Sequence, residues 1–272
     1  MPTNGNAFSY DGYEDMLVEK QEGVVLATLN VPEKLNAMTT GIRQGIKRLI
    51  HEIRSDDEAR VLVLTGAGRA FCAGADVSIG AGSAYAKDGT RPNVMEPRYR
   101  WVSDFVSLDK PTIACVNGVA AGGGLALALM CDIRIASEKA RFISVFVRRG
   151  LTPDNGTSWL LPRLIGKSKA LKMILTGDEV NAQEAYRIGL ADEIASEDDA
   201  LTNAMTLARK IASNPPVTVE LSKRAVLKGL ETSLVQQAEY EEYIQRIVRE
   251  TDDFAEIALA REENRSPEFK GI

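Results

Sequence analysis

Histidine is almost absent from this chain: His51 is the only one among 272 residues. A serine–histidine–aspartate triad needs a histidine beside its nucleophile, and zinc sites commonly use several. His51 lies in the segment 40–54, off an apolar stripe with helical spacing, so we expect it on the surface. The stripe consists of Ile42, Ile46, Leu49, Ile50 and Ile53. The composition argues against a histidine triad or a multi-histidine metal centre, and we expect no metal ion.

Cysteine is also scarce, at three residues: Cys72, Cys115 and Cys131. The number is odd, no two are spaced as a pair, and each is surrounded by apolar or small residues. We therefore expect buried, reduced thiols and no disulfide framework. A reactive Cys72 is the alternative, but no histidine or second cysteine lies near it in the sequence.

The chain has no excess of positive charge and no long apolar run. It carries 33 Lys and Arg against 38 Asp and Glu, a net charge of -5, with an isoelectric point near 5.2. Nucleic acid is not expected as a main partner, because it usually binds a basic face. No stretch approaches the roughly 20 apolar residues of a membrane span. Residues 1–15 hold no Lys or Arg, so no leader segment is expected and the predicted location is cytoplasmic.

Strand-like and helix-like patterns alternate through the first two thirds of the chain. Apolar runs predict strands at 24–29, 61–65, 112–116 and 132–136. Helical spacing is seen at 40–54, 98–108 and 125–130. Such alternation predicts an α/β fold with parallel pairing between successive units. The segment 78–97, rich in Gly, Ala, Pro and charge, is predicted to be a loop over a site.

The last third is almost purely helical in pattern. Apolar residues recur every three or four positions at 199–213, 217–230 and 234–249. We place a boundary near Ser196, which gives a core of residues 1–196 and a helical region of residues 197–272. The apolar faces of these helices must be buried on the core or on a neighbouring chain.

Two stretches rich in glycine and alanine are the strongest functional signal. Residues 71–76 read FCAGAD and residues 117–126 read NGVAAGGGLA. Each follows an apolar strand pattern, and small side chains there let a ligand lie against backbone N–H groups. Gly123 would begin the helix after the second strand, and Ala75 can supply a donor from the first turn. Two converging amides would stabilise a developing negative charge, as in an oxyanion hole. Taken alone, three consecutive glycines indicate close packing of a helix on a strand as readily as they indicate a ligand site.

Six segments in their order and spacing resemble the crotonase family, also called the enoyl-CoA hydratase/isomerase family. They are 32–37 (PEKLNA), 73–76 (AGAD), 117–124 (NGVAAGGG), 131–136 (CDIRIA), 175–177 (LTG) and 189–190 (GL). The resemblance implies a spiral of ββα units and a C-terminal helical part used for trimerisation. It also implies an acyl-CoA thioester substrate whose carbonyl oxygen lies between the N–H groups of Ala75 and Gly123.

The resemblance further implies where coenzyme A would bind. Five residues match the segments that line its groove: Lys34, Leu35, Ala37, Ala73 and Asp76. No separate cofactor is expected, because coenzyme A enters as part of the substrate. A homotrimer or hexamer is implied, with Phe269 and Lys270 as candidates to contact a neighbour's ligand. For the segment 265–270 we favour a frayed, solvated tail instead.

The chemistry depends on which carboxylate stands beside the amides. Hydratases of this family use two glutamates, and the matching positions here hold Ala126 and Phe146. Hydration by the usual pair is therefore not expected. Asp154 instead matches the aspartate of family members that shift double bonds, among them the ring-epoxide isomerase of phenylacetyl-CoA breakdown. We expect an isomerase in which Asp154 is the base.

An apolar pocket of Phe146, Leu151 and Trp159 would raise the pKa of Asp154. The alternatives are an atypical hydratase and a catalytically silent acyl-CoA-binding protein in which Asp154 merely caps a helix. A dehalogenase-like nucleophile is less favoured, since the required histidine is missing from 84–105. Glu96 and Asp104 are further candidate acids, although a solvated face suits both better.

Overall fold

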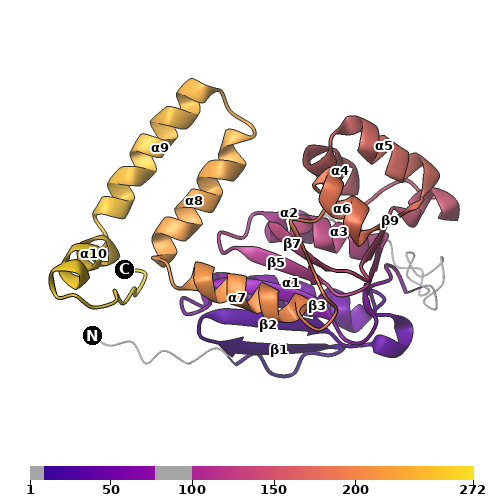
Figure 1. Ribbon diagram of the computed structural model, residues 1–272, viewed down its shortest axis with the longest axis horizontal. Coiled ribbons are helices and arrows are strands. Elements are labelled where there is room, and N and C mark those ends of the chain that lie inside the picture. The colour runs from indigo at the N-terminus through magenta and orange to yellow at the C-terminus, as the bar shows by residue number, and fades with distance from the viewer. Residues whose placement is uncertain (1–8, 77–99) are drawn as a thin grey trace, which may run out of the picture.

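The computed structural model describes residues 9–76 and 100–272, arranged as two sheets with covering helices (Figure 1). Among these residues the large sheet has six strands in the order β1-β2-β3-β5-β7-β10. They are β1 (Met16–Gln21), β2 (Val24–Leu29), β3 (Val61–Gly66), β5 (Thr112–Val116), β7 (Ile133–Ser137) and β10 (Glu193–Ala195). β1 pairs antiparallel with β2, and all later neighbours pair parallel. The predicted α/β class and parallel pairing are confirmed. The loop predicted at 78–97, with Glu96, lies outside the described residues.

A second sheet stands beside the first and has the order β4-β6-β8-β9 within the described residues. Its strands are β4 (Ala70–Cys72), β6 (Val119–Ala121), β8 (Arg141–Ile143) and β9 (Glu179–Asn181). Each of the first three follows a strand of the large sheet after a short turn. The chain therefore consists of repeated ββα units, as expected for the spiral fold.

Helices and short 3₁₀ turns fill the intervals between the strands. They are η1 (Pro32–Lys34), α1 (Thr40–Ser55), α2 (Arg100–Val106), α3 (Gly123–Met130), η3 (Val145–Arg149), α4 (Thr157–Ile165), α5 (Lys167–Thr176), α6 (Ala182–Ile188), α7 (Ala200–Ala212), α8 (Pro216–Gly229), α9 (Leu234–Arg249) and α10 (Asp252–Glu262). Thr39 caps α1 by accepting a hydrogen bond from the Ile42 N–H at 3.1 Å. The stripe on α1 is buried and His51 is exposed, as predicted.

The two faces of the large sheet bury alternate residues. On β3, Leu62 and Leu64 belong to the core shared with α1 and α3, whereas Val61 and Val63 pack toward α7. Side chains of successive strand residues point to opposite faces, so a strand covered on both sides reads as a continuous apolar run. α7 contributes alanines at four-residue spacing to this second core: Ala200, Ala204, Ala208 and Ala212. Small side chains there let α7 lie close to the sheet.

The three cysteines are free and buried, which confirms the expectation of structural thiols. Burial raises the pKa of Cys72 to about 11 and that of Cys131 to about 12. Almost no thiolate forms at neutral pH under these conditions, so the alternative of a reactive Cys72 loses its chemical basis.

Beyond α7 the chain leaves the sheets. α8 and α9 form a helical hairpin that projects from the body, and α10 lies at the end of α9 that runs back toward the start of α8 (Figure 1). The tail after α10 is mostly exposed, as expected of a solvated segment, but it is not frayed, so that part of the expectation is wrong. The buried Asp253 carboxylate accepts the N–H groups of Lys270 at 2.6 Å and Gly271 at 2.8 Å. Arg60 donates to the Phe269 carbonyl oxygen at 2.5 Å, so the tail folds back onto its own chain.

Asn36 is a buried link between the first unit and the second sheet. Its Oδ1 accepts the Val31 N–H at 2.9 Å, and its Nδ2 donates to the carbonyls of Ala67 and Ala70 at 2.9 and 2.7 Å. The residue is fully buried and has a φ of 54°. Asn36 thereby fixes the segment 67–70, which leads into the turn at 73–76.

Replacing Asn36 by alanine should destabilise the fold by about 2–4 kcal/mol, because three hydrogen bonds to backbone groups are lost, two of them buried. Asn264→Ala is the matched control, since Asn264 has nearly the same backbone (φ 52°) but is exposed. Urea unfolding of both variants at one protein concentration measures the difference. Equal losses would mean that backbone strain, and not the hydrogen bonds, makes Asn36 important.

Candidate functional site

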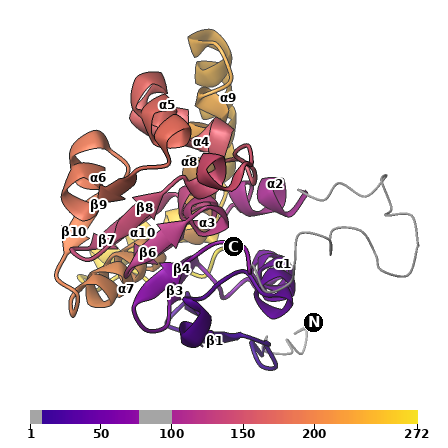
Figure 2. The ribbon, with the colours of Figure 1, turned by 90° about the vertical axis from the view of Figure 1, so that its right-hand side faces the viewer.

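The two glycine-rich turns lie side by side at one edge of the second sheet. β4 and β6 pair parallel, with Cys72 opposite Ala120, so the turns that follow both strands emerge together (Figure 2). A Cβ on Gly74 would lie 2.6 Å from the Ala121 carbonyl oxygen and 3.3 Å from the Gly123 nitrogen. A Cβ on Gly124 would collide with the Cys72 carbonyl. The turns thus pack backbone against backbone, and only glycine fits.

Each turn presents an N–H group that has no protein acceptor among the described residues. Gly123 is the first residue of α3, where the N–H groups of a helix lack partners, and Gly122 before it has a φ of 52°. Ala75 is held by a parallel bridge to Met38, whose N–H donates to the Gly74 carbonyl at 2.7 Å. This bridge leaves the Ala75 N–H unused. The predicted pair of donors is therefore free to bind an oxygen atom.

The five residues predicted to line the coenzyme A groove come from two segments that the fold joins. The Ala73 N–H donates to the Leu35 carbonyl at 2.9 Å, and Lys34 pairs with Asp76 at 3.1 Å. Ala37 is buried beside them. Lys34 keeps about half of its side chain exposed, at 47%. The structure thus brings all five residues next to Ala75, and their role in binding stays a prediction.

Asp154 lies in the loop between η3 and α4 and is exposed. The cap of α4 is Gly156, with no side-chain cap bond, so the interpretation of Asp154 as a helix cap is wrong. Its Oδ1 accepts a hydrogen bond from Asn155 Nδ2 at 2.8 Å. Burial of the carboxylate among its neighbours raises the pKa of Asp154, while Asn155 and the positive charge of Arg43 oppose the rise.

The Asp154 loop, the Gly123 turn and the Met38 bridge meet at one place. A Cβ on Gly123 would lie 3.9 Å from each of three atoms: Asn155 Nδ2, Met38 Cγ and Gly74 Cα. Gly123 has no side chain, so this position is open space bordered by both turns and by the neighbour of Asp154. The backbones of both turns and the Asn155 side chain, which is bonded to Asp154, therefore border one small open volume.

The three residues predicted to form an apolar pocket differ in their surroundings. Phe146 is buried at 5% exposure, whereas Leu151 and Trp159 are 61% and 42% exposed. The Leu151 N–H donates to the Phe146 carbonyl at 3.0 Å, and the guanidinium of Arg163 lies 3.8 Å from the centre of the Trp159 ring. The structure does not bring the three together into an enclosed pocket within the single chain.

No carboxylate replaces the two missing glutamates at their own positions. Ala126 is fully buried in α3, and Phe146 lies in η3. Asp104 is on the exposed side of α2, 3.9 Å from Arg100, which suits a solvated face. No group of three or more His, Cys, Asp or Glu suitable for a metal ion is found in residues 9–76 and 100–272. In the same residues, no helix is long and apolar enough to cross a membrane.

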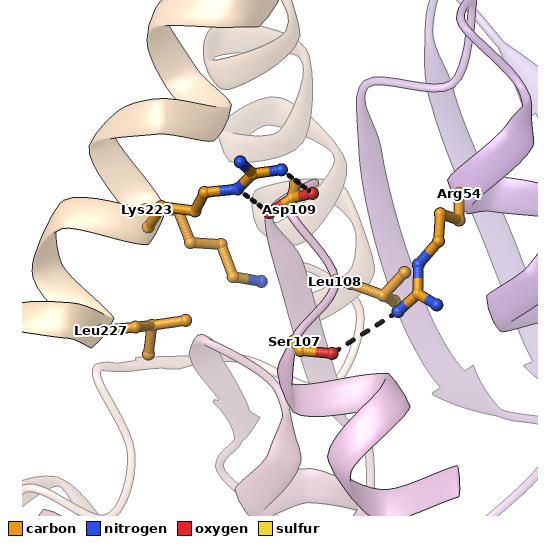
Figure 3. A pocket seen from close by; sticks show the side chains of 7 residues that line it. Arg54, Ser107, Leu108, Asp109, Lys223 and Leu227 are labelled. Carbon is orange, nitrogen blue, oxygen red and sulfur yellow. Dashed lines mark hydrogen bonds and ion pairs between the residues drawn. The ribbon is translucent and has the colours of Figure 1, made fainter. Parts of the chain in front are cut away.

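A separate hollow of about 450 Å³ lies where α8 docks on the body (Figure 3). Arg224 binds Asp109 through two hydrogen bonds of 2.5 and 2.6 Å, and Lys223 pairs with Asp132 at 2.6 Å. Asp109 precedes β5 of the large sheet, whereas the Gly123 turn follows β6 of the second sheet. The charges around the hollow join α8 to the segments that flank β5 and β7.

The comparisons with known proteins agree with this architecture. The sequence model of the family "Enoyl-CoA hydratase/isomerase" matches residues 19–272. The chain is 35% identical over 262 residues to the 1,2-epoxyphenylacetyl-CoA isomerase of Escherichia coli K12, covering 95% of this chain and 99% of that protein. It is 37% identical over 227 residues to the short-chain-enoyl-CoA hydratase of Clostridium acetobutylicum, covering 81% and 84%.

A solved enoyl-CoA hydratase from Bacillus anthracis has a TM-score of 0.83 and 32% identity, with 95% of this chain and 100% of that chain covered. With Ala75, Gly123 and the second sheet arranged as described, the chain belongs to the enoyl-CoA hydratase/isomerase family. The predicted family and fold are confirmed.

Replacing Asp154 by asparagine should raise the melting temperature at neutral pH. The pKa of Asp154 is higher in the folded protein than in the unfolded chain, so the folded state is more stable when this carboxyl is neutral. That contribution to the free energy of unfolding is lost as the pH rises through the folded-state pKa. The gain should vanish below the ordinary aspartate pKa of 3.8, where the carboxyl is protonated in both states. Thermal unfolding between about pH 3 and pH 8 measures this, with Asp104→Asn as an exposed control. A lower melting temperature of Asp154→Asn than of the wild type at neutral pH would contradict a raised pKa of Asp154.

Proposed function

We propose that this chain is an acyl-CoA isomerase that shifts a double bond in an unsaturated acyl group, open-chain or cyclic, with Asp154 as the base. The observation that carries the proposal is the convergence at Gly123: the loop of Asp154 borders the two free amides. Its carboxylate holds no structural role as a helix cap. The glutamate positions of the hydratases hold Ala126 and Phe146, which removes the usual means of activating water.

The mechanism follows from these groups. The thioester carbonyl oxygen would accept hydrogen bonds from the Ala75 and Gly123 N–H groups, which stabilise the enolate formed when a C–H proton leaves. Asp154 takes that proton, and the electron pair of the C–H bond enters the conjugated enolate. The same carboxyl then returns the proton to a carbon two positions along, so the double bond moves and no atom is gained or lost. A raised pKa suits this exchange, because a carboxyl must both accept and give the proton.

In this proposal coenzyme A binds only as part of the thioester, in the predicted coenzyme A groove. The groove is lined by Lys34, Leu35, Ala37, Ala73 and Asp76. Neither a further cofactor nor a metal ion is needed for a proton shift. The isomerase named among the relatives supports this choice, and the hydratases named beside it support the alternative. A hydratase would require another group to activate water.

Wild-type protein and the Asp154→Asn variant should differ sharply when each is given 3-enoyl-CoA and 2-enoyl-CoA. We expect the wild type to move the double bond without adding water, and the variant to lose roughly 100-fold or more in rate. Mass spectrometry detects water addition, and absorbance follows bond position. Asp104→Asn is the control for a second acid and should retain the wild-type rate.

Hydration that survives in Asp154→Asn would favour the atypical hydratase. Tight binding of both thioesters with no turnover would lead to cyclic thioesters next, and failure there would favour the silent binding protein. Surviving hydration, or a failure to turn over cyclic thioesters as well, would remove Asp154 from the role proposed here.

We also propose that the chain works as a homotrimer or hexamer assembled through α8–α10. These helices expose a set of large apolar side chains: Val226, Leu230, Leu234, Val235, Phe254 and Ile257. Apolar faces this exposed in one chain are usually covered by another. The division into residues 1–196 and 197–272 stays a prediction, and because α7 packs on the large sheet, the part of 197–272 proposed for association is α8–α10. A cytoplasmic location is likewise a prediction.

Analytical ultracentrifugation of the wild type should give a molar mass three or six times that of the chain, which is 29.6 kDa. Leu234→Glu, at a position that is 85% exposed, should shift the protein toward smaller species without unfolding it. Leu17→Glu is the control, since Leu17 is also exposed, at 53%, but lies on β1. A monomeric wild type would refute the assembly.

A further inference from the structure

We propose that Asn155 is a positioning residue that holds one oxygen of Asp154 and leaves the other for proton transfer. The inference rests on the proposed function, because it takes Asp154 as the base. Asn155 has no place in the motifs that carry the family resemblance, and it enters here from the geometry of its loop.

The backbone of Asn155 turns its side chain back onto its own neighbour. Its φ is 50°, in the left-handed region, and Gly156 after it has a φ of 79°. Asparagine tolerates this region better than most residues with a side chain. The turn brings Nδ2 to 2.8 Å from Asp154 Oδ1, a hydrogen bond between adjacent side chains. The strained conformation thus has a local effect, which is to fix the rotation of the carboxylate.

The bond distinguishes the two carboxylate oxygens. Among the described residues, Asn155 is the one side chain that donates to Asp154, and its bond engages Oδ1. Oδ2, which Asn155 does not engage, accepts the substrate proton in this arrangement, and the main-chain N–H of Asp154 itself is a further donor to the carboxylate. The same Nδ2 lies 3.9 Å from where a Cβ of Gly123 would be. Asn155 therefore joins the carboxylate to the place where the two amides would hold the thioester oxygen.

Two more groups act on this carboxylate: the main-chain N–H of Asp154 itself and the side chain of Arg43. Arg43 comes from α1, and its Nε donates to the Met38 carbonyl at 3.0 Å. Its positive charge and the Asn155 bond both lower the pKa of Asp154, against the larger effect of burial. Loss of the Asn155 carboxamide removes one of the interactions that lower the pKa of Asp154. The effect of burial then has less to counteract it, so this pKa should rise further.

Asn155→Gly tests the inference without endangering the fold, because glycine adopts a positive φ at no cost. Asn264→Gly is the matched control, an exposed asparagine with a φ of 52° remote from the site. The first readout is the titration of Asp154, followed by NMR of protein labelled with ¹³C at aspartate carboxyls and assigned by comparison with Asp154→Asn. The second is the pH profile of kcat for 3-enoyl-CoA.

We expect Asn155→Gly to move the titration of Asp154 upward by roughly half to one pH unit, and the acid limb of kcat by the same amount. Below that limb the rate should fall roughly 3- to 10-fold with KM little changed. The Asn264→Gly variant should match the wild type in both. An unchanged titration in Asn155→Gly would overturn the inference.

The two readouts separate this inference from the proposed function. The NMR titration needs no turnover, so a shifted pKa in a protein without isomerase activity would refute the isomerase and retain the contact. A lowered kcat at every pH with an unmoved titration would mean that Asn155 merely shapes the loop, which would also refute the positioning role.

Discussion

Close contact between two backbone turns is the constraint on which the rest of the structure depends. Gly74 and Gly124 lie against the carbonyls of Ala121 and Cys72 at distances that admit no side chain. Parallel pairing of β4 with β6 brings the turns together, and the large sheet holds those strands in place. The N–H groups that remain unpaired are therefore a result of the fold and need no particular side chain.

Much of the frame could be predicted because its signals are local. β5 and α9 occur at the predicted residues, since an uninterrupted apolar run or a sustained three-to-four spacing needs no distant information. α4, α5, α6 and α10 were not predicted. α4 contains Pro162, which disfavours a helix prediction, and α10 distributes its apolar residues around the helix, so it shows no clear apolar face. The fixed tail was missed because Asp253 and Arg60 hold it through contacts that the sequence does not pair.

In the candidate site, too, residues with local sequence signals could be predicted, and residues that depend on distant contacts could not. Ala75 and Gly123 were readable from small residues after a strand, and the absent glutamates from positions in the sequence. Asn36, Arg43 and Asn155 were not, because their importance arises from a positive φ or from segments far apart in the chain. The exposure of Leu151 and Trp159 likewise follows from how α4 is placed, which sequence patterns do not report. Burial and charge around a carboxylate need the folded chain.

The position of Trp159 has an optical consequence. The chain has two tryptophans, Trp101 on α2 and Trp159 on α4, and the two helices meet where a Cβ on Gly156 would lie 3.2 Å from Val102. Trp159 lies directly under the Arg163 guanidinium, so its emission is sensitive to any shift of that charge. Helices α7–α10 contain no tryptophan. Tryptophan emission of this protein therefore reports on α2 and α4, near Asp154, and carries no direct signal from the helices that project from the body.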